Sequence, residues 1–77
     1  MKGGDLMREF PRISLRAARV NADIDQITAA KALGVTPVTI RNWESGKTPP
    51  DVRQAEMLAG LYKFPIDLID FSRYSEE

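Results

Sequence analysis

The chain has no cysteine and no histidine among its 77 residues. The first absence excludes disulfides and thiol nucleophiles, and the second excludes an imidazole base. Together they remove the thiolate and imidazole ligands that hold zinc and most other transition metals. We therefore expect no enzyme, no cofactor and no metal site.

Long apolar runs are also missing. No stretch approaches the roughly 18 residues that a membrane span requires. The beginning of the chain carries no apolar segment of the signal-peptide kind. These absences predict a cytoplasmic protein with no membrane partner.

Charge of one sign does not dominate, since 11 Lys and Arg residues balance 11 Asp and Glu residues. The charges are unevenly placed, however. Residues 14–50 carry five positive and three negative side chains, whereas residues 51–77 carry three positive and six negative ones. A mildly basic first part is typical of a protein with one face toward phosphate.

The length allows a single small domain, which buries only roughly 60% of its unfolded surface. Without disulfides or zinc, its stability has to come from helix packing, self-association or both. The sequence predicts a flexible N-terminal arm over 1–12, a folded domain over 13–71 and a polar tail over 72–77. The native start stays open between Met1 and Met7, because purine-rich codons for residues 2–5 would resemble a ribosome-binding site.

Helix-capping residues divide the domain into short helices. Ser14, Asp25 and Thr36 are good N-caps, and Asp51 with Gln54 forms a capping-box pattern. Glycines at 34 and 46 are C-terminal stop signals, and Pro37 suits a first helical position. The expected helices span residues 15–21, 26–33, 36–45, 52–62 and 66–71. No strand pattern is present, so the predicted fold class is all-α, a compact five-helix domain.

Apolar residues recur at helical spacing along these segments. The predicted buried positions are Leu15, Ala18, Arg19 and Ala22, then Ile27, Ala30 and Leu33, then Val52, Ala55, Leu58, Ala59 and Tyr62. The aromatic residues Trp43, Tyr62 and Phe64 are also expected in the core.

The helix over 36–45 has two faces of different chemistry. Ile40 and Trp43 lie three residues apart on one side and are expected to be buried. The other side carries Pro37, Val38, Arg41 and Asn42. A guanidinium can donate two bonds to guanine, a carboxamide can pair with adenine, and a methyl group can contact thymine. The second face is therefore suited to reading base edges.

The second and third helices are joined by the tight connection Leu33-Gly34-Val35-Thr36, which predicts a helix–turn–helix. With these residues the sequence resembles the lambda-repressor-like DNA-binding domains of the phage repressor, Cro and Xre group, over roughly 13–71. The matching positions are Arg19, Gln26, Ala30, residues 33–35, Thr39, Ile40, residues 43–47, Pro50, Tyr62 and residues 64–67.

The resemblance implies roles for single residues. It implies DNA base contacts at Gln26, Pro37, Val38, Arg41 and Asn42. It implies phosphate contacts at Arg16, Thr36, Ser45, Gly46 and Lys47.

The resemblance also implies an ion pair between Arg19 and Glu44, which both fall within apolar stripes. The alternative is two solvated charges at helix edges. It further implies a two-fold contact around the fifth helix, for which Ile69, Phe71 and Tyr74 are candidates. The alternative is that these residues fold back on their own domain.

The function that follows is a sequence-specific DNA-binding transcriptional regulator, a phage- or Xre-type repressor or a Cro-like protein that occupies operator DNA. One small domain makes few base contacts, so a homodimer is expected at least on DNA, with half-sites about 34 Å apart. The alternative is a helix–turn–helix module that binds a protein partner, such as an antirepressor or antitoxin.

Overall fold

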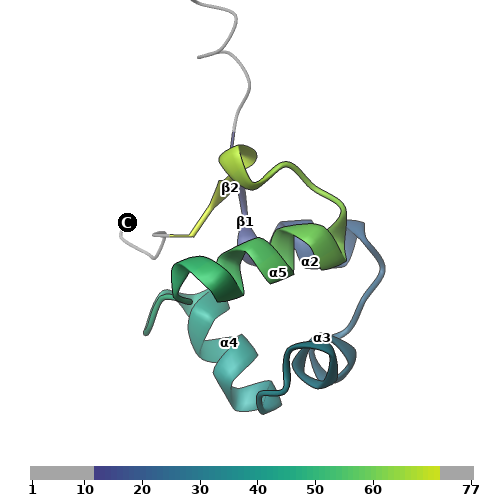
Figure 1. Ribbon diagram of the computed structural model, residues 1–77, viewed down its shortest axis with the longest axis vertical. Helices are drawn as coiled ribbons and strands as arrows, with labels where there is room; N and C mark the ends of the chain where they lie inside the picture. Colours follow the sequence, from purple (N-terminus) through teal and green to yellow (C-terminus); the bar gives the residue numbers. More distant parts are fainter. Residues whose placement is uncertain (1–11, 72–77) are drawn as a thin grey trace, which may run out of the picture.

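The computed structural model describes residues 12–71, which form a small helical domain (Figure 1). Its helices are α2 (Leu15–Asn21), α3 (Gln26–Leu33), α4 (Pro37–Ser45) and α5 (Val52–Tyr62). A 3-10 turn, η1, covers Ile66–Leu68, and two short strands are β1 (Ile13–Ser14) and β2 (Ile69–Asp70). The predicted arm, apart from Arg12, and the predicted tail lie outside the described residues.

Side-chain caps begin all four of these helices, as the sequence predicted. The capping oxygens of Ser14, Asp25, Thr36 and Asp51 each accept a hydrogen bond from the backbone N–H three residues later. At α3, accepting the N–H of Thr28 lowers the pKa of the Asp25 carboxyl. At α5, the Gln54 side chain also accepts from the Asp51 N–H, which completes the capping box.

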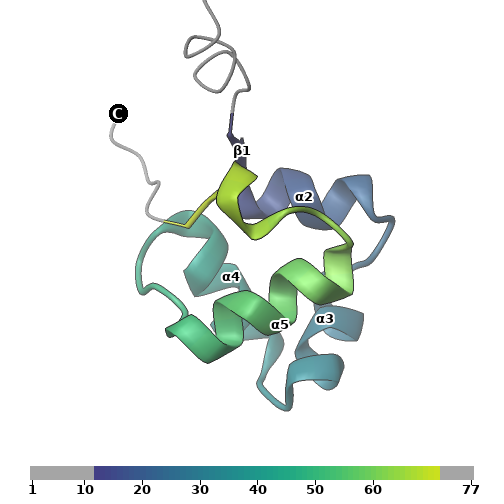
Figure 2. The ribbon, with the colours of Figure 1, turned by 45° about the horizontal axis from the view of Figure 1, so that its top comes forward.

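The core lies where the helices meet. Figures 1 and 2 show α5 running through the middle of the domain, with α2 on one side and α3 on the other, and both helices contact it. Ile40 of α4 and Leu58 of α5 are fully buried. The remaining members of the cluster are mostly small or aromatic residues: Leu15, Ala18, Ala29, Ala30, Trp43, Ala59, Tyr62 and Ile69.

The prediction of a helix over 66–71 is wrong beyond Leu68. After the single turn of η1, the chain extends as β2 and pairs in parallel with β1, with Ile13 opposite Ile69 and Ser14 opposite Asp70. The expectation of no strand is wrong at these four residues for the same reason. The partner of Ile69 stands at the other end of the domain sequence, so local periodicity could not reveal it.

Two predicted core positions are also wrong. Ile27 is 59% exposed and Val52 is 75% exposed. The core-facing side of α3 is centred on Ala29, Ala30 and Leu33, and Ile27 lies about 110° away from it around the helix. Val52 is the first residue of α5. Within residues 12–71 no helix is long and apolar enough to cross a membrane.

Candidate nucleic-acid interface

A buried ion pair joins α2 to α4. Arg19 Nε lies 2.6 Å from Glu44 Oε2, and Arg19 Nη2 donates to Glu44 Oε1 at 3.2 Å. The two side chains are only 10% and 5% exposed. Donating to Glu44 raises the pKa of Arg19, so the guanidinium stays charged. The structure thus brings Arg19 and Glu44 together, and they are not two solvated charges.

The same carboxylate also holds α3. Gln26 Nε2 donates to Glu44 Oε1 at 3.1 Å, and Arg19 Nη1 donates to the carbonyl of Ile24 at 2.9 Å. The sequence predicted neither bond, because nothing in the spacing of these residues indicates their proximity. Glu44 therefore links three helices and fixes the amide of Gln26 against the C-terminal half of α4.

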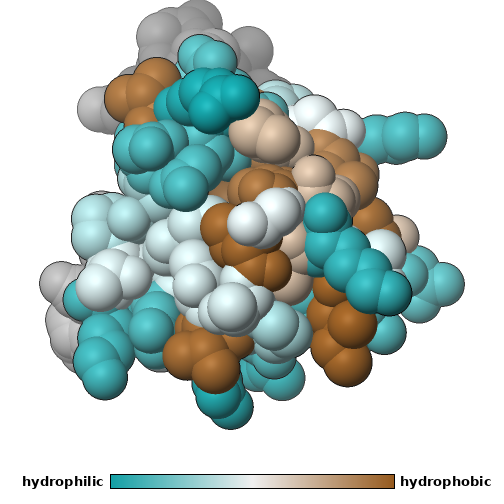
Figure 3. Space-filling view, turned by 60° about the horizontal axis from the view of Figure 1, so that its bottom comes forward, coloured by the Kyte–Doolittle hydropathy of each residue, from teal (hydrophilic) through white to brown (hydrophobic). Residues whose placement is uncertain are grey.

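The faces of α4 are separated as the sequence predicted. Ile40 is 0% and Trp43 is 5% exposed. Pro37, Val38 and Arg41 are exposed, and Asn42 is half-buried. Figure 3 views the end of the domain that carries α3 and α4, and it shows a mixed face on which hydrophilic and near-neutral side chains alternate with exposed hydrophobic ones.

A hollow of about 430 Å³ brings together four of the predicted DNA contacts. It is lined by Arg16 of α2, Gln26 of α3, and Arg41, Glu44 and Ser45 of α4. Because Glu44 is paired with Arg19, the guanidinium groups of Arg16 and Arg41 give the hollow a positive character. Two guanidinium groups beside a carboxamide suit a phosphodiester backbone and the base edges next to it.

Comparison with known proteins agrees with this geometry. The helix–turn–helix family model matches residues 15–69, which contain all four α-helices of the described part. The chain belongs to the lambda-repressor and Xre-like helix–turn–helix family. No curated protein and no solved structure gives a significant match.

The remaining predicted phosphate contacts of this helix–turn–helix protein lie at the two ends of α4. Thr36 is exposed, but its hydroxyl already accepts from the Thr39 N–H. The Gly46 N–H donates to the Trp43 carbonyl within the C-terminal cap, so it is not a spare donor for phosphate. The phosphate contact predicted at Gly46 therefore stays a prediction, and its N–H would have to be shared with the Trp43 carbonyl. The exposed side chain of Lys47 remains the candidate donor in this loop.

Two of the three residues proposed for the two-fold contact pack against the core of their own domain. Ile69 is 3% exposed and belongs to the core, and Phe71 packs against the same core. The burial of Ile69 favours the alternative, in which this residue packs against its own domain. Tyr74 lies outside the described residues.

The buried hydroxyl group of Tyr62 lowers the stability of the domain. Its side chain is 2% exposed, and within residues 12–71 its hydroxyl has no hydrogen-bond partner. Burial, with a smaller effect from the charge of Glu44, raises the pKa of Tyr62 to about 12. An unpaired buried hydroxyl is unfavourable by roughly 1–3 kcal/mol.

We therefore expect Tyr62→Phe to stabilise the domain. A gain of about 1 kcal/mol would raise the melting temperature by roughly 4–8 °C.

The raised pKa of Tyr62 also makes the stability of the wild type depend on pH. Below pH 10 the phenol is neutral in both the folded and the unfolded state, and as pH rises from 10 toward about 12 the unfolded state ionises first, so the wild type loses stability. Thermal melts at pH 7 and pH 11 should show the variant losing less stability than the wild type. A lower melting temperature for the variant at pH 7 would contradict the assignment.

Proposed function

We propose that this helix–turn–helix protein is a sequence-specific transcriptional regulator that occupies operator DNA, as a phage- or Xre-type repressor or a Cro-like protein does. The observation that carries the proposal is the division of α4 into a buried face and an exposed one. Ile40 and Trp43 anchor the helix, while Pro37, Val38 and Arg41 remain accessible. A helix held in this way can enter a major groove without rearranging its own domain.

The exposed residues divide into two classes of DNA contact. Arg41, Asn42 and Val38 match the edges of guanine, adenine and thymine, respectively, in the major groove. Arg16 of α2 lines the same hollow as Arg41, and Lys47 follows α4; both side chains suit phosphates, which fix the register of the protein on DNA. Gln26 fits either class of contact, and its side-chain amide donates a hydrogen bond to Glu44.

The proposed mechanism is steric, in that the bound protein covers promoter elements. The described domain is small, and a single copy offers few base contacts. Useful specificity therefore favours two copies on half-sites about 34 Å apart. The helix pair α3–α4 with its turn at Gly34 is the unit that we assign to DNA.

Selection from a random-sequence duplex library tests this function for any operator sequence. We expect the wild-type protein to enrich one sequence and its binding to weaken steeply with salt. Arg41→Ala should lower the affinity for that sequence by about 10–100-fold, measured by fluorescence anisotropy.

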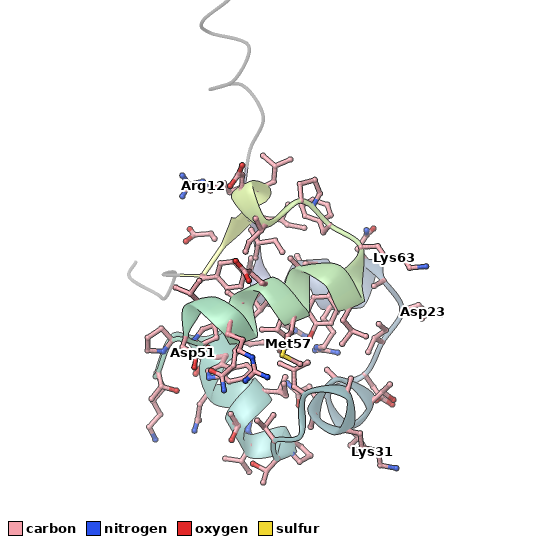
Figure 4. All side chains as sticks on the ribbon, in the orientation of Figure 1. Arg12, Asp23, Lys31, Asp51, Met57 and Lys63 are labelled. Carbon is pink, nitrogen blue, oxygen red and sulfur yellow. The ribbon has the colours of Figure 1, made fainter. Side chains whose placement is uncertain are left out.

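The matched control is Arg12→Ala, which removes the same charge at the opposite end of the domain from α3 and α4 (Figure 4). It should change affinity by much less. If no sequence is enriched, or if both variants weaken binding equally, the proposed reading of bases by α4 is wrong.

A second candidate function is a protein-interaction module, such as an antirepressor or antitoxin. It is favoured by the exposure of Ile27 (59%) and Val38 (51%), which lie on neighbouring helices. Failure to enrich any DNA, together with co-purification of the product of a neighbouring gene, would support this function instead.

A further inference from the structure

The side chain of Gln26 is held by a group that can only accept hydrogen bonds. Its Nε2 donates to Glu44 Oε1 at 3.1 Å, and the Glu44 side chain is 5% exposed. Glu44 is itself fixed from the other side, because Arg19 donates to Oε2 at 2.6 Å and to Oε1 at 3.2 Å. The half-buried amide of Gln26 therefore meets a carboxylate whose position is set by a second partner.

This bond decides which end of the Gln26 amide faces Glu44. The two ends of a carboxamide have nearly the same shape, but one carries two N–H donors and the other is an oxygen that only accepts. A half-turn about the last side-chain bond exchanges them. An ionised carboxylate has no hydrogen to donate, so the exchanged orientation would bring two acceptor oxygens together. Glu44 thus selects one of the two orientations.

The groups that Gln26 has left are one N–H and the oxygen Oε1. Within residues 12–71 the side chain makes no hydrogen bond besides the one to Glu44. Gln26 lines the hollow together with Arg16 and Arg41, whose guanidinium groups supply donors alone and so suit phosphate oxygens. Oε1 is an acceptor that a phosphate oxygen would repel. It needs a ligand that donates.

We propose that Gln26 reads an adenine, and that Glu44 is the positioning residue that orients it for this base. In the major groove adenine presents an N6 amino group that donates and an N7 atom that accepts. Oε1 and the remaining N–H of Gln26 match these two groups. Guanine and thymine would face Oε1 with an acceptor, O6 or O4, and cytosine offers a donor but no acceptor for the N–H.

This inference rests on the proposed function, since it requires that α4 lies in a major groove. It gives the ion pair of Arg19 and Glu44 a role in base selection besides its role in stability. Because Glu44 belongs to α4 and Gln26 to α3, their hydrogen bond also ties the amide to the helix that we assign to the neighbouring bases. The adenine is therefore expected at a fixed position relative to those bases.

The test uses the duplex that the wild-type protein selects from the random library, remade with each base in turn at every position. Fluorescence anisotropy gives the affinity for each duplex. At one position we expect the wild type to prefer adenine to guanine by about tenfold or more. Gln26→Met, which keeps the length of the side chain and removes its polar groups, should lose this preference and keep those at the other positions.

Glu44→Gln tests the positioning. The new amide keeps the shape of the carboxylate but can present either an oxygen or an N–H to Gln26, so both orientations of Gln26 become acceptable. The adenine preference should fall toward that of Gln26→Met, at the same position and at no other. Because this variant also loses the ion pair with Arg19, binding is measured at a temperature at which circular dichroism shows the protein folded.

Leu61→Ala is the matched control for lost stability. Leu61 packs against the core from α5 and does not line the hollow. Its truncation should lower the melting temperature and leave every base preference unchanged. A merely structural effect of Glu44→Gln would likewise weaken the binding of all duplexes alike, and could not change the preference at a single position.

Three results would overturn the proposal. They are a preferred base other than adenine at the position that depends on Gln26, base preferences that Gln26→Met leaves unchanged, and a full adenine preference in Glu44→Gln. Each of them leaves the proposed function standing, because the wild type has still selected a DNA sequence. If no sequence is enriched, the proposed function fails and this inference fails with it.

Discussion

Arg19→Met is expected to lower the free energy of unfolding by about 3–5 kcal/mol, the cost of breaking a buried ion pair from one side. Glu44, whose side chain is 5% exposed, would be left with only the amide of Gln26 as a hydrogen-bond donor. The carbonyl of Ile24 would also lose the hydrogen bond from Arg19. A domain of this size has a total stability toward the lower end of about 5–15 kcal/mol, so much of it would be lost.

Trp43 is the only tryptophan, and its fluorescence offers a direct measure of this unfolding in urea. The control is the double variant Arg19→Met with Glu44→Leu, in which no unpaired charge is left buried. We expect it to be more stable than the single variant, because apolar replacement of a whole buried pair is often neutral. Equal stability of Arg19→Met and the wild type would show that the pair contributes little.

Trp43→Ala is expected to lower the free energy of unfolding by about 3–5 kcal/mol, the usual range for removing a large buried aromatic side chain. Trp43 is 5% exposed and packs in the core from α4, beside Ile40 on the same face. Its removal should loosen α4 against the rest of the domain. DNA binding should therefore weaken as well, although Trp43 does not face the DNA.

Circular dichroism melts serve for this variant, since it lacks the fluorescent residue. Val38→Ala is the matched control on the opposite face of α4, and Val38 is 51% exposed. It should change stability by less than about 0.5 kcal/mol and weaken only the binding of DNA that carries a thymine methyl at the contacted position. A Trp43→Ala variant with unchanged melting would show that α4 is not anchored through this residue.

The helix boundaries could be read from the sequence because their causes are local. Asp25 caps α3 through an N–H three residues away, and Gly34 ends that helix in a left-handed conformation. The two faces of α4 follow from the spacing of Ile40 and Trp43 alone. Such signals involve neighbours within about one turn, so they do not depend on the rest of the fold.

The candidate site was predictable only in part. The resemblance to the family placed Arg16, Gln26 and Arg41 on the DNA-facing side, and the structure gathers them around one hollow. It did not indicate that Gln26 donates to Glu44, or that the Gly46 N–H is used within its own helix cap. These details depend on distances between helices and on how α4 ends.

The sequence by itself determined where α2, α3, α4 and α5 begin and which face of α4 is apolar, because capping and helical spacing act between residues a few positions apart. Only the tertiary structure decided that Ile69 pairs with Ile13, that Ile27 stays exposed, and that Glu44 joins three helices. Each of these features requires segments that are distant in the chain to meet, and their meeting is set by the packing of the whole domain.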